Sequence, residues 1–145
     1  MINLSILISN DMDYIDTDVL VHSLVNQNFN LHLKVIDMID EINSSNRFLI
    51  SWLSIQEIGF VLAKLNQPTA FITSKLGALV SSLPVGYGSS EFTRAMGLAA
   101  VIGYKNFNDC LHTAIAEQYC SDLYTCNYKD FKRIQPHTSL NIHFL

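Results

Sequence analysis

The stretch "RFLISWLSIQEIGFVLAKL", residues 47–65, places a short apolar run directly before a helix signal. Residues 47–52 are rich in aromatic and aliphatic side chains, and the run has the length of a buried strand. Ser54 is followed three residues later by Glu57, which is the S-x-x-E pattern of a capping box. We therefore expect a strand that ends, and a helix that begins, near Leu53.

The same alternation of strand and helix signals continues on both sides of this stretch. Apolar residues recur at helical spacing over 19–45, with a break at "NQNFN" (26–30), and again over 69–83, 91–104 and 107–120. Further strands are expected at 12–15, 121–127 and 140–145. Strands that alternate with helices predict an α/β fold, a three-layer α/β/α sandwich around a mainly parallel sheet.

Composition indicates a single globular domain over residues 1–145. The chain is 49% hydrophobic and 15% charged, which argues against disorder. No apolar run reaches the length of a membrane span, and the first residues lack the features of a signal peptide, so we expect a cytoplasmic protein with no membrane partner. Cys110, Cys120 and Cys126 show no C-x-x-C spacing, and we expect them to be reduced thiols.

The net charge of −4 argues against binding nucleic acid through a broad basic surface. A nucleic-acid partner would have to be engaged locally. The basic residues cluster once, at Lys129, Lys132 and Arg133. Either phosphate contact or a solvated surface explains this cluster.

Four acidic residues follow separate predicted elements. Asp16 ends the first strand, Glu57 follows the second, Asp109 opens a later helix, and Asp130 lies beyond the strand at 121–127. Because the carboxyl ends of parallel strands and the following helix starts share one edge, these acids are able to converge. Two carboxylates about 5 Å apart repel by about 3 kcal/mol at an effective dielectric constant near 20. Such a cluster needs protons or a cation, and oxygen ligands suit Mg²⁺ or Mn²⁺.

Three segments resemble, in order, the motifs of PIN-domain ribonucleases, and especially the VapC-type toxins of toxin-antitoxin systems. They are "YIDTDVLVHSL" (14–24), "ISWLSIQEIGFVL" (50–62) and "NFNDCLHTAIAEQYCSDLYTCNYKDFKRI" (106–134). The last segment is the most specific, because it combines D-x-x-H-x-A-x-A with T-x-N-x-x-D-F. Residues 1–11 depart from the family pattern and form a candidate N-terminal extension.

The resemblance implies a PIN-like fold and Mg²⁺- or Mn²⁺-dependent hydrolysis of RNA by the toxin of a type II pair. By this resemblance the catalytic metal ligands are Asp16, Glu57, Asp109 and Asp130, although some members carry an acid at the position of Asn127. The expected supporting residues are Asp18, Thr125 and Asn127. Lys129, Lys132 and Arg133 are expected to contact RNA. A cognate antitoxin and a homodimer are the implied partners.

Each acid also has a structural explanation. Glu57 completes the predicted capping box, and Asp109 is an acid of the kind favoured at a helix N-terminus. Asp18 could cap a helix that starts near Val19, and Asp130 could form a surface ion pair. His112 could touch the site or be a packed, hydrogen-bonded histidine. The aromatic residues expected in the core are Trp52, Phe48 and Tyr124.

Two other functions compete with the nuclease. "IDTDVL" (15–20) also resembles the D-x-D strand end of haloacid-dehalogenase-like phosphatases, with Asp16 as nucleophile and Asp18 as general acid. The Gly-Thr that usually follows this motif is absent here. The third function is a PIN-like binding module without catalysis, because a fold does not guarantee an activity.

Overall fold

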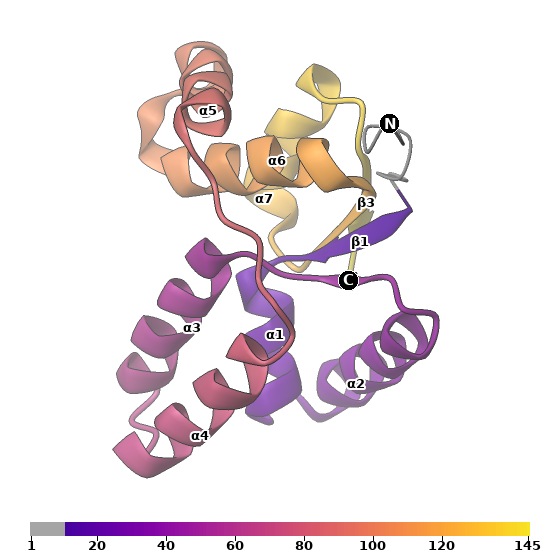
Figure 1. Ribbon diagram of the computed structural model, residues 1–145, viewed down its shortest axis with the longest axis vertical. Coiled ribbons are helices and arrows are strands. Elements are labelled where there is room, and N and C mark those ends of the chain that lie inside the picture. The colour runs from indigo at the N-terminus through magenta and orange to yellow at the C-terminus, as the bar shows by residue number, and fades with distance from the viewer. Residues whose placement is uncertain (1–10) are drawn as a thin grey trace, which may run out of the picture.

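In the computed structural model, which describes residues 11–145, a parallel sheet lies between two layers of helices (Figure 1). The strands are β1 (Met12–Ile15), β2 (Phe48–Leu49), β3 (Cys120–Thr125) and β4 (Asn141–Phe144), in the spatial order β2-β1-β3-β4. All three strand pairs are parallel, which confirms the predicted fold class. The candidate extension lies outside the described residues except for Asp11, which forms an antiparallel bridge with Cys120.

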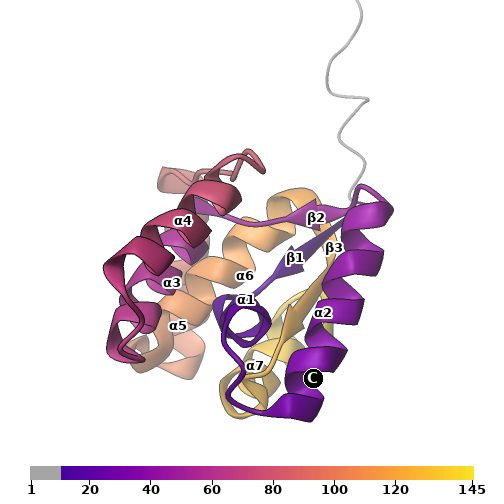
Figure 2. The same ribbon diagram turned by 90° about the horizontal axis from the view of Figure 1, so that it is seen from below.

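The helices divide between the two faces of the sheet (Figures 1 and 2). One face carries α1 (Thr17–Leu24), α2 (Phe29–Ser44), α3 (Trp52–Lys64) and α4 (Thr69–Val80). The other carries α5 (Ser89–Ile102), α6 (Phe107–Tyr119) and α7 (Tyr128–Ile134), with short 3-10 turns η2 (Tyr104–Asn106) and η3 (Gln135–His137). The break predicted at 26–30 separates α1 from α2. Helix α7 was not predicted, and within 11–145 no helix has the length and hydropathy needed to cross a membrane.

Two hydrophobic cores form because successive strand residues point to opposite faces. Tyr14 of β1 packs in the core under α5, α6 and α7, whereas Ile15 packs in the core under α1, α2 and α3. Leu123 and Tyr124 of β3 divide in the same way. A parallel sheet that is covered on both faces is the expected result.

The start of α3 differs from the prediction. Trp52 is already helical, and Ser51 is the N-cap, whose hydroxyl oxygen accepts a hydrogen bond from the Ser54 amide at 3.1 Å. The predicted capping box between Ser54 and Glu57 is therefore wrong, and Glu57 lies further along α3. Trp52 was expected in the core, but its position at the helix start leaves it 47% exposed.

The connection from α4 to α5 runs along the edge of the sheet beside β2 (Figure 1). The Val85 amide donates to the Ile50 carbonyl at 3.0 Å, and the Val85 carbonyl accepts from the Trp52 amide at 3.0 Å. These bonds form an isolated parallel bridge between Ser51 and Val85, just past the end of β2. They also fix the point at which the chain passes from one helical layer to the other.

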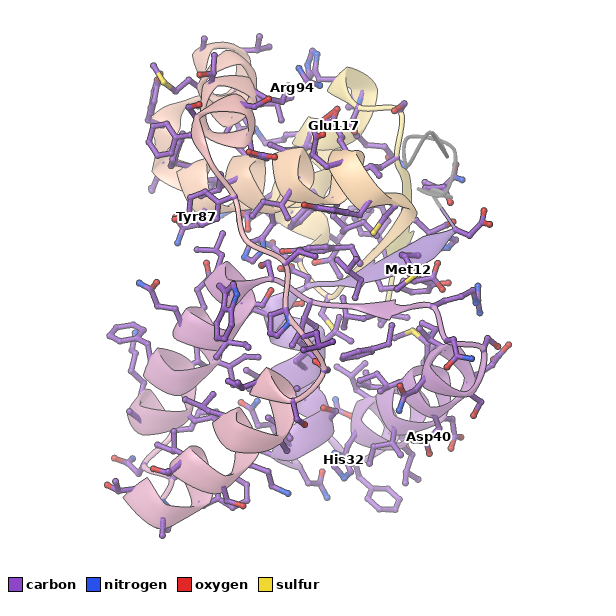
Figure 3. The ribbon with its side chains drawn as sticks, in the orientation of Figure 1. Met12, His32, Asp40, Tyr87, Arg94 and Glu117 are labelled. Atoms are coloured by element: carbon purple, nitrogen blue, oxygen red, sulfur yellow. The ribbon has the colours of Figure 1, made fainter. Side chains whose placement is uncertain are left out.

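Two ion pairs hold elements in place. Arg94 of α5 lies 3.1 Å from Glu117 of α6 and also donates to the His137 carbonyl at 2.8 Å (Figure 3). Arg47 lies 3.0 Å from the buried carboxylate of Asp13 in β1. Burial raises the pKa of Asp13, and the guanidinium of Arg47 opposes this shift. The first pair fixes α5 on α6, and the second compensates a charge inside the sheet.

Candidate active site

A cavity of about 290 Å³ opens where β1 ends, with walls from α1, α3, α6 and the turn before α7. Its lining contains four carboxylates and, among the described residues, no lysine or arginine. The acids are Asp16, Asp18, Glu57 and Asp109. The structure thus brings together three of the four predicted ligands with one predicted supporting acid.

Asp16 is held on both of its carboxylate oxygens. As the N-cap of α1 it accepts from the Thr17 amide at 2.8 Å through Oδ1, and it accepts from the Thr125 hydroxyl at 2.8 Å through Oδ2. Thr125 ends β3, so the carboxyl ends of two neighbouring strands meet at this carboxylate. Asp16, rather than Asp18, caps the helix, and the capping role considered for Asp18 is wrong.

Asp18 lies in the first turn of α1 and faces the same cavity. Its Oδ1 accepts from the Cys126 amide at 3.2 Å. Burial, with a further contribution from the charge of Asp16, raises the pKa of Asp18 to about 8. Asp18 thus belongs to the acidic cluster, although no hydrogen bond of the described residues joins it directly to Asp16.

Glu57 reaches the cavity from α3 and is the most heavily hydrogen-bonded acid of the cluster. Its Oε2 accepts from the Thr17 hydroxyl at 2.6 Å and lies 3.0 Å from Nε2 of His112, while its Oε1 accepts from the Asn108 amide at 3.0 Å. Burial by itself would raise the pKa of Glu57. The bonds from His112, Thr17 and Asn108 outweigh burial and lower it, so Glu57 is ionised.

A buried chain of hydrogen bonds supports Glu57 from below. His112 is 1% exposed, and its Nδ1 lies 2.6 Å from the Tyr14 hydroxyl, which lies 2.7 Å from the Ser51 hydroxyl. Burial lowers the pKa of His112, but Tyr14, Glu57 and Asp16 together raise it well above its usual value. The two interpretations of His112 are both correct, because the ring is packed and also contacts the site.

Asp109 opens into the cavity from the first turn of α6. Burial, followed by the charge of Asp16, raises the pKa of Asp109 to about 7. Its Oδ2 accepts from the Asn127 amide at 3.3 Å, and the same amide nitrogen donates to Asp130 Oδ2 at 3.0 Å. One asparagine therefore links two of the predicted acids.

Asp130 lies outside the lining of the cavity, while Asn127 is part of it. Both oxygens of Asp130 accept hydrogen bonds from amides, Oδ1 from Asn106 at 2.9 Å and Oδ2 from Asn127. The surface ion pair considered for Asp130 does not occur among residues 11–145. Its role as a fourth ligand stays a prediction.

The predicted RNA-contacting residues lie on α7. Arg133 donates to the Ile102 carbonyl at the end of α5, and the Lys132 ammonium lies 5.3 Å from the centre of the Tyr128 ring. Neither these two residues nor Lys129 lines the acidic cavity. Their contact with RNA stays a prediction.

Sequence reasoning missed Tyr14, Thr17 and Asn108, each of which contacts the cluster or its support. Asn108 precedes Asp109 in the quoted motif, and Thr17 lies between the two aspartates, so proximity in the sequence was the available signal. Tyr14 carried no such signal, because a tyrosine inside a strand is typical of core packing.

The donor set fits a divalent cation. Among residues 11–145 no three Asp, Glu, His or Cys side chains enclose an ion as they stand. Hydroxyl and amide groups donate to several of the carboxylate oxygens. However, the acids supply oxygen ligands only, and burial, followed by repulsion from the charge of Asp16, raises the pKa values of Asp18 and Asp109. A hard cation such as Mg²⁺ or Mn²⁺ would relieve that repulsion.

Comparison with known proteins identifies the fold. No protein-family model matches the chain, and no curated protein matches it. Among solved structures, a chain of VapBC2 from Rickettsia felis, crystallised with a DNA fragment from the promoter, matches with a TM-score of 0.65. The match covers 91% of this chain and 98% of that chain. This chain has a PIN-like fold. The sequences are 22% identical, so the resemblance to VapC-type PIN domains is confirmed for the fold, and the PIN-like sheet edge carries the acidic cavity.

Proposed function

We propose that this protein is a divalent-metal-dependent endoribonuclease and the toxin of a type II toxin-antitoxin pair. The observation that carries the proposal is the convergence of Asp16, Glu57 and Asp109 in one cavity, from three separate parts of a PIN-like fold. The likeness to a VapBC2 chain supports the assignment as a toxin. The residue motifs quoted above support the assignment as a ribonuclease.

The three acids share one task in this proposal, which is to hold a divalent cation. A bound Mg²⁺ or Mn²⁺ ion would supply Lewis acidity, lowering the pKa of an attacking water and stabilising charge at the phosphate. Asp16, Glu57 and Asp109 would hold it. Thr17 and Thr125 orient two of these carboxylates through their hydroxyl groups. No protein nucleophile is then required.

Asp18 and Asn127 complete the cavity wall in this proposal. Asp18 adds negative charge beside Asp16, and Asn127 positions Asp109. Asp130 fixes the Asn127 amide that faces Asp109, and its predicted role as a fourth ligand is the alternative that Asp130→Asn tests. Such supporting groups orient ligands and affect both metal affinity and activity.

The direct test is cleavage of RNA by the purified protein. We expect hydrolysis in millimolar Mg²⁺ or Mn²⁺ and none in EDTA. Asp109→Asn should lower the rate by more than about 100-fold, since it removes a ligand charge. Asp40→Asn is the matched control, because Asp40 is an exposed acid on α2, away from the cavity (Figure 3). Cleavage that persists in EDTA would contradict the metal-dependent mechanism.

The phosphatase mechanism predicts a covalent phosphoryl intermediate on Asp16. In that mechanism Asp16 attacks phosphorus and becomes phosphorylated. In this structure both oxygens of Asp16 accept hydrogen bonds, which favours a fixed ligand over a free nucleophile. Mass spectrometry after incubation with a phosphate monoester should detect no phosphoryl group on Asp16, and its detection would overturn the proposal.

The proposed partners are tested separately from the chemistry. The solved relative is VapBC2 with DNA, and we propose a cognate antitoxin that covers the acidic cavity and a homodimer of this chain. The reading frame next to this gene should encode a short DNA-binding protein. Co-expression of the two should give a complex that does not cleave RNA. Cleavage of RNA by the complex at the rate of the protein alone would exclude the adjacent protein as an antitoxin.

A further inference from the structure

A second cavity, of about 410 Å³, adjoins the acidic one. It is lined by six consecutive residues, from Tyr104 to Asp109, that run from η2 into the first turn of α6. Asp109 lines both cavities. Asn108 also lines the second cavity and donates to Glu57, so this space opens beside two of the proposed ligands.

Lys105 is the cation of this second cavity. Among the described residues it is the one lysine or arginine that lines either cavity. The arginines are engaged elsewhere: Arg47 with Asp13, Arg94 with Glu117 and Arg133 with the Ile102 carbonyl. A polyanion that approaches four carboxylates on a chain of net charge −4 needs a local positive charge, and Lys105 supplies one.

Beside Lys105 lies a fixed aromatic platform. The Tyr104 ring stacks on the Phe107 ring, with centroids 5.8 Å apart and an interplanar angle of 11°, yet Tyr104 is 58% exposed. Phe92 braces Phe107 edge-on at 5.0 Å. The same side chains, with Met96, line an apolar cavity of about 240 Å³ on α5. A rigid, exposed ring beside a cation is the combination that binds single-stranded nucleic acid.

We propose that Tyr104 and Lys105 form a subsite for the nucleotide next to the cleaved bond of a single-stranded RNA. The Lys105 ammonium pairs with its phosphate in the polar cavity, and its base stacks on the exposed ring of Tyr104. This inference rests on the proposed function for its substrate. It places an RNA contact on η2, next to Asp109.

The test compares three variants with a matched control. Lys105→Ala and Tyr104→Ala remove the two contacts, whereas Tyr104→Phe keeps the ring. Lys75→Ala makes the same charge change on α4, where the ammonium lies over the Phe71 ring. Two quantities are measured for each protein: kcat/KM for cleavage of a random single-stranded RNA pool in Mg²⁺, and the salt dependence of binding to that pool in EDTA. Melting temperatures check that each variant folds.

The two contacts should respond differently. Tyr104→Ala should lower affinity and kcat/KM by about tenfold without changing the salt slope, and Tyr104→Phe should stay near wild type. Lys105→Ala should lower both quantities and reduce the slope of log K against log salt by about 0.7, the value for one phosphate contact on a single strand. Lys75→Ala should change neither. These shifts would support the subsite.

Other outcomes separate the inference from the proposed function. If wild type cleaves RNA and both alanine variants match Lys75→Ala, the subsite is excluded while the nuclease stands. If wild type binds the pool with the predicted slopes but cleaves nothing, the nuclease fails and the subsite stands. If wild type neither binds nor cleaves, both are overturned.

Discussion

Nε2 of His112 lies 3.0 Å from Oε2 of Glu57, although 55 positions separate the two residues in the sequence. The other ring nitrogen lies 2.6 Å from the Tyr14 hydroxyl. A protonated imidazole donates to both and fixes the direction of the carboxylate. Because Ser51 caps α3, Glu57 has no part in starting that helix. His112 therefore orients the Glu57 carboxylate toward the cavity, where it is free of any capping role.

Glu57→Gln should abolish function while leaving α3 in place. We expect RNA cleavage to fall by more than about 100-fold, because the substitution removes a ligand charge. The melting temperature should fall modestly, since an amide nitrogen then faces a donor from Thr17, His112 or Asn108. Cleavage assays and thermal melts measure the two effects.

Glu91→Gln is the control for that variant. The Glu91 carboxylate accepts from the Gly88 amide at 2.9 Å at the start of α5, and Glu91 does not line the cavity. It should lower stability slightly and leave cleavage unchanged. Retention of full activity by Glu57→Gln would remove Glu57 from the site.

Tyr14→Phe should break the buried hydrogen-bond chain that runs from Ser51 through Tyr14 and His112 to the Glu57 carboxylate. Loss of the hydroxyl leaves the buried His112 and Ser51 groups without their partner, which should cost about 1–3 kcal/mol of unfolding free energy. If the chain positions Glu57, kcat should also fall, by about tenfold, with KM little changed. Denaturant unfolding and steady-state kinetics measure both. Tyr87→Phe, at an exposed tyrosine (Figure 3), should do neither, and a loss of stability with unchanged kcat would limit Tyr14 to packing.

Without metal, stability should fall as pH rises. The folded chain keeps protons on Asp109 up to about pH 7 and on Asp18 up to about pH 8, whereas an unfolded aspartate loses its proton near pH 4. The native state thus binds more protons over this range, so its stability decreases from about pH 4 to about pH 8. The raised pKa of His112 acts in the same direction.

Mg²⁺ should reverse this trend, because it stabilises the deprotonated carboxylates by binding the native state. The gain in melting temperature on adding millimolar Mg²⁺ should be larger at about pH 8.5 than at about pH 5.5. Asp18→Asn should flatten the metal-free profile. A melting temperature that changes with neither pH nor Mg²⁺ would favour the binding module over the enzyme.

Asp130→Asn distinguishes a ligand from a residue that acts through Asn127. Both oxygens of Asp130 accept from amides, so the substitution should misplace Asn127 without removing a charge from the cavity lining. We expect cleavage to fall about tenfold, against more than about 100-fold for Asp109→Asn. Equal losses in the two variants, with equal weakening of Mg²⁺ binding, would make Asp130 a direct ligand.

The sequence predicts the layers of this fold well because periodicity reports burial. Strand β1 is apolar on both faces at Tyr14 and Ile15, and each residue enters a different core. Helix α7 was not predicted. Three of its seven residues are basic, and only Phe131 and Ile134 are buried. A short helix carries too few apolar repeats to show a period.

The sequence predicted the wrong helix cap where two serines fitted the same capping pattern. Ser51 and Ser54 both precede an apolar run, and in the structure Ser51 caps α3 and accepts from the Ser54 amide. The order of the acids along the chain did indicate the cavity. The hydrogen bonds among Tyr14, His112 and Glu57 cross between elements remote in sequence, and no local pattern reports such contacts.

The pairing of Val85 with Ser51, just past β2, also governs how this sheet can meet other chains. An edge strand with free amide and carbonyl groups is a template for strand addition and aggregation. On the β2 edge, at Ser51, the chain itself occupies part of that template. Within residues 11–145, the opposite edge, at β4, pairs only with β3. Asn141–Phe144 is therefore the longer open edge strand, at which intermolecular strand pairing, in an assembly or an aggregate, would begin.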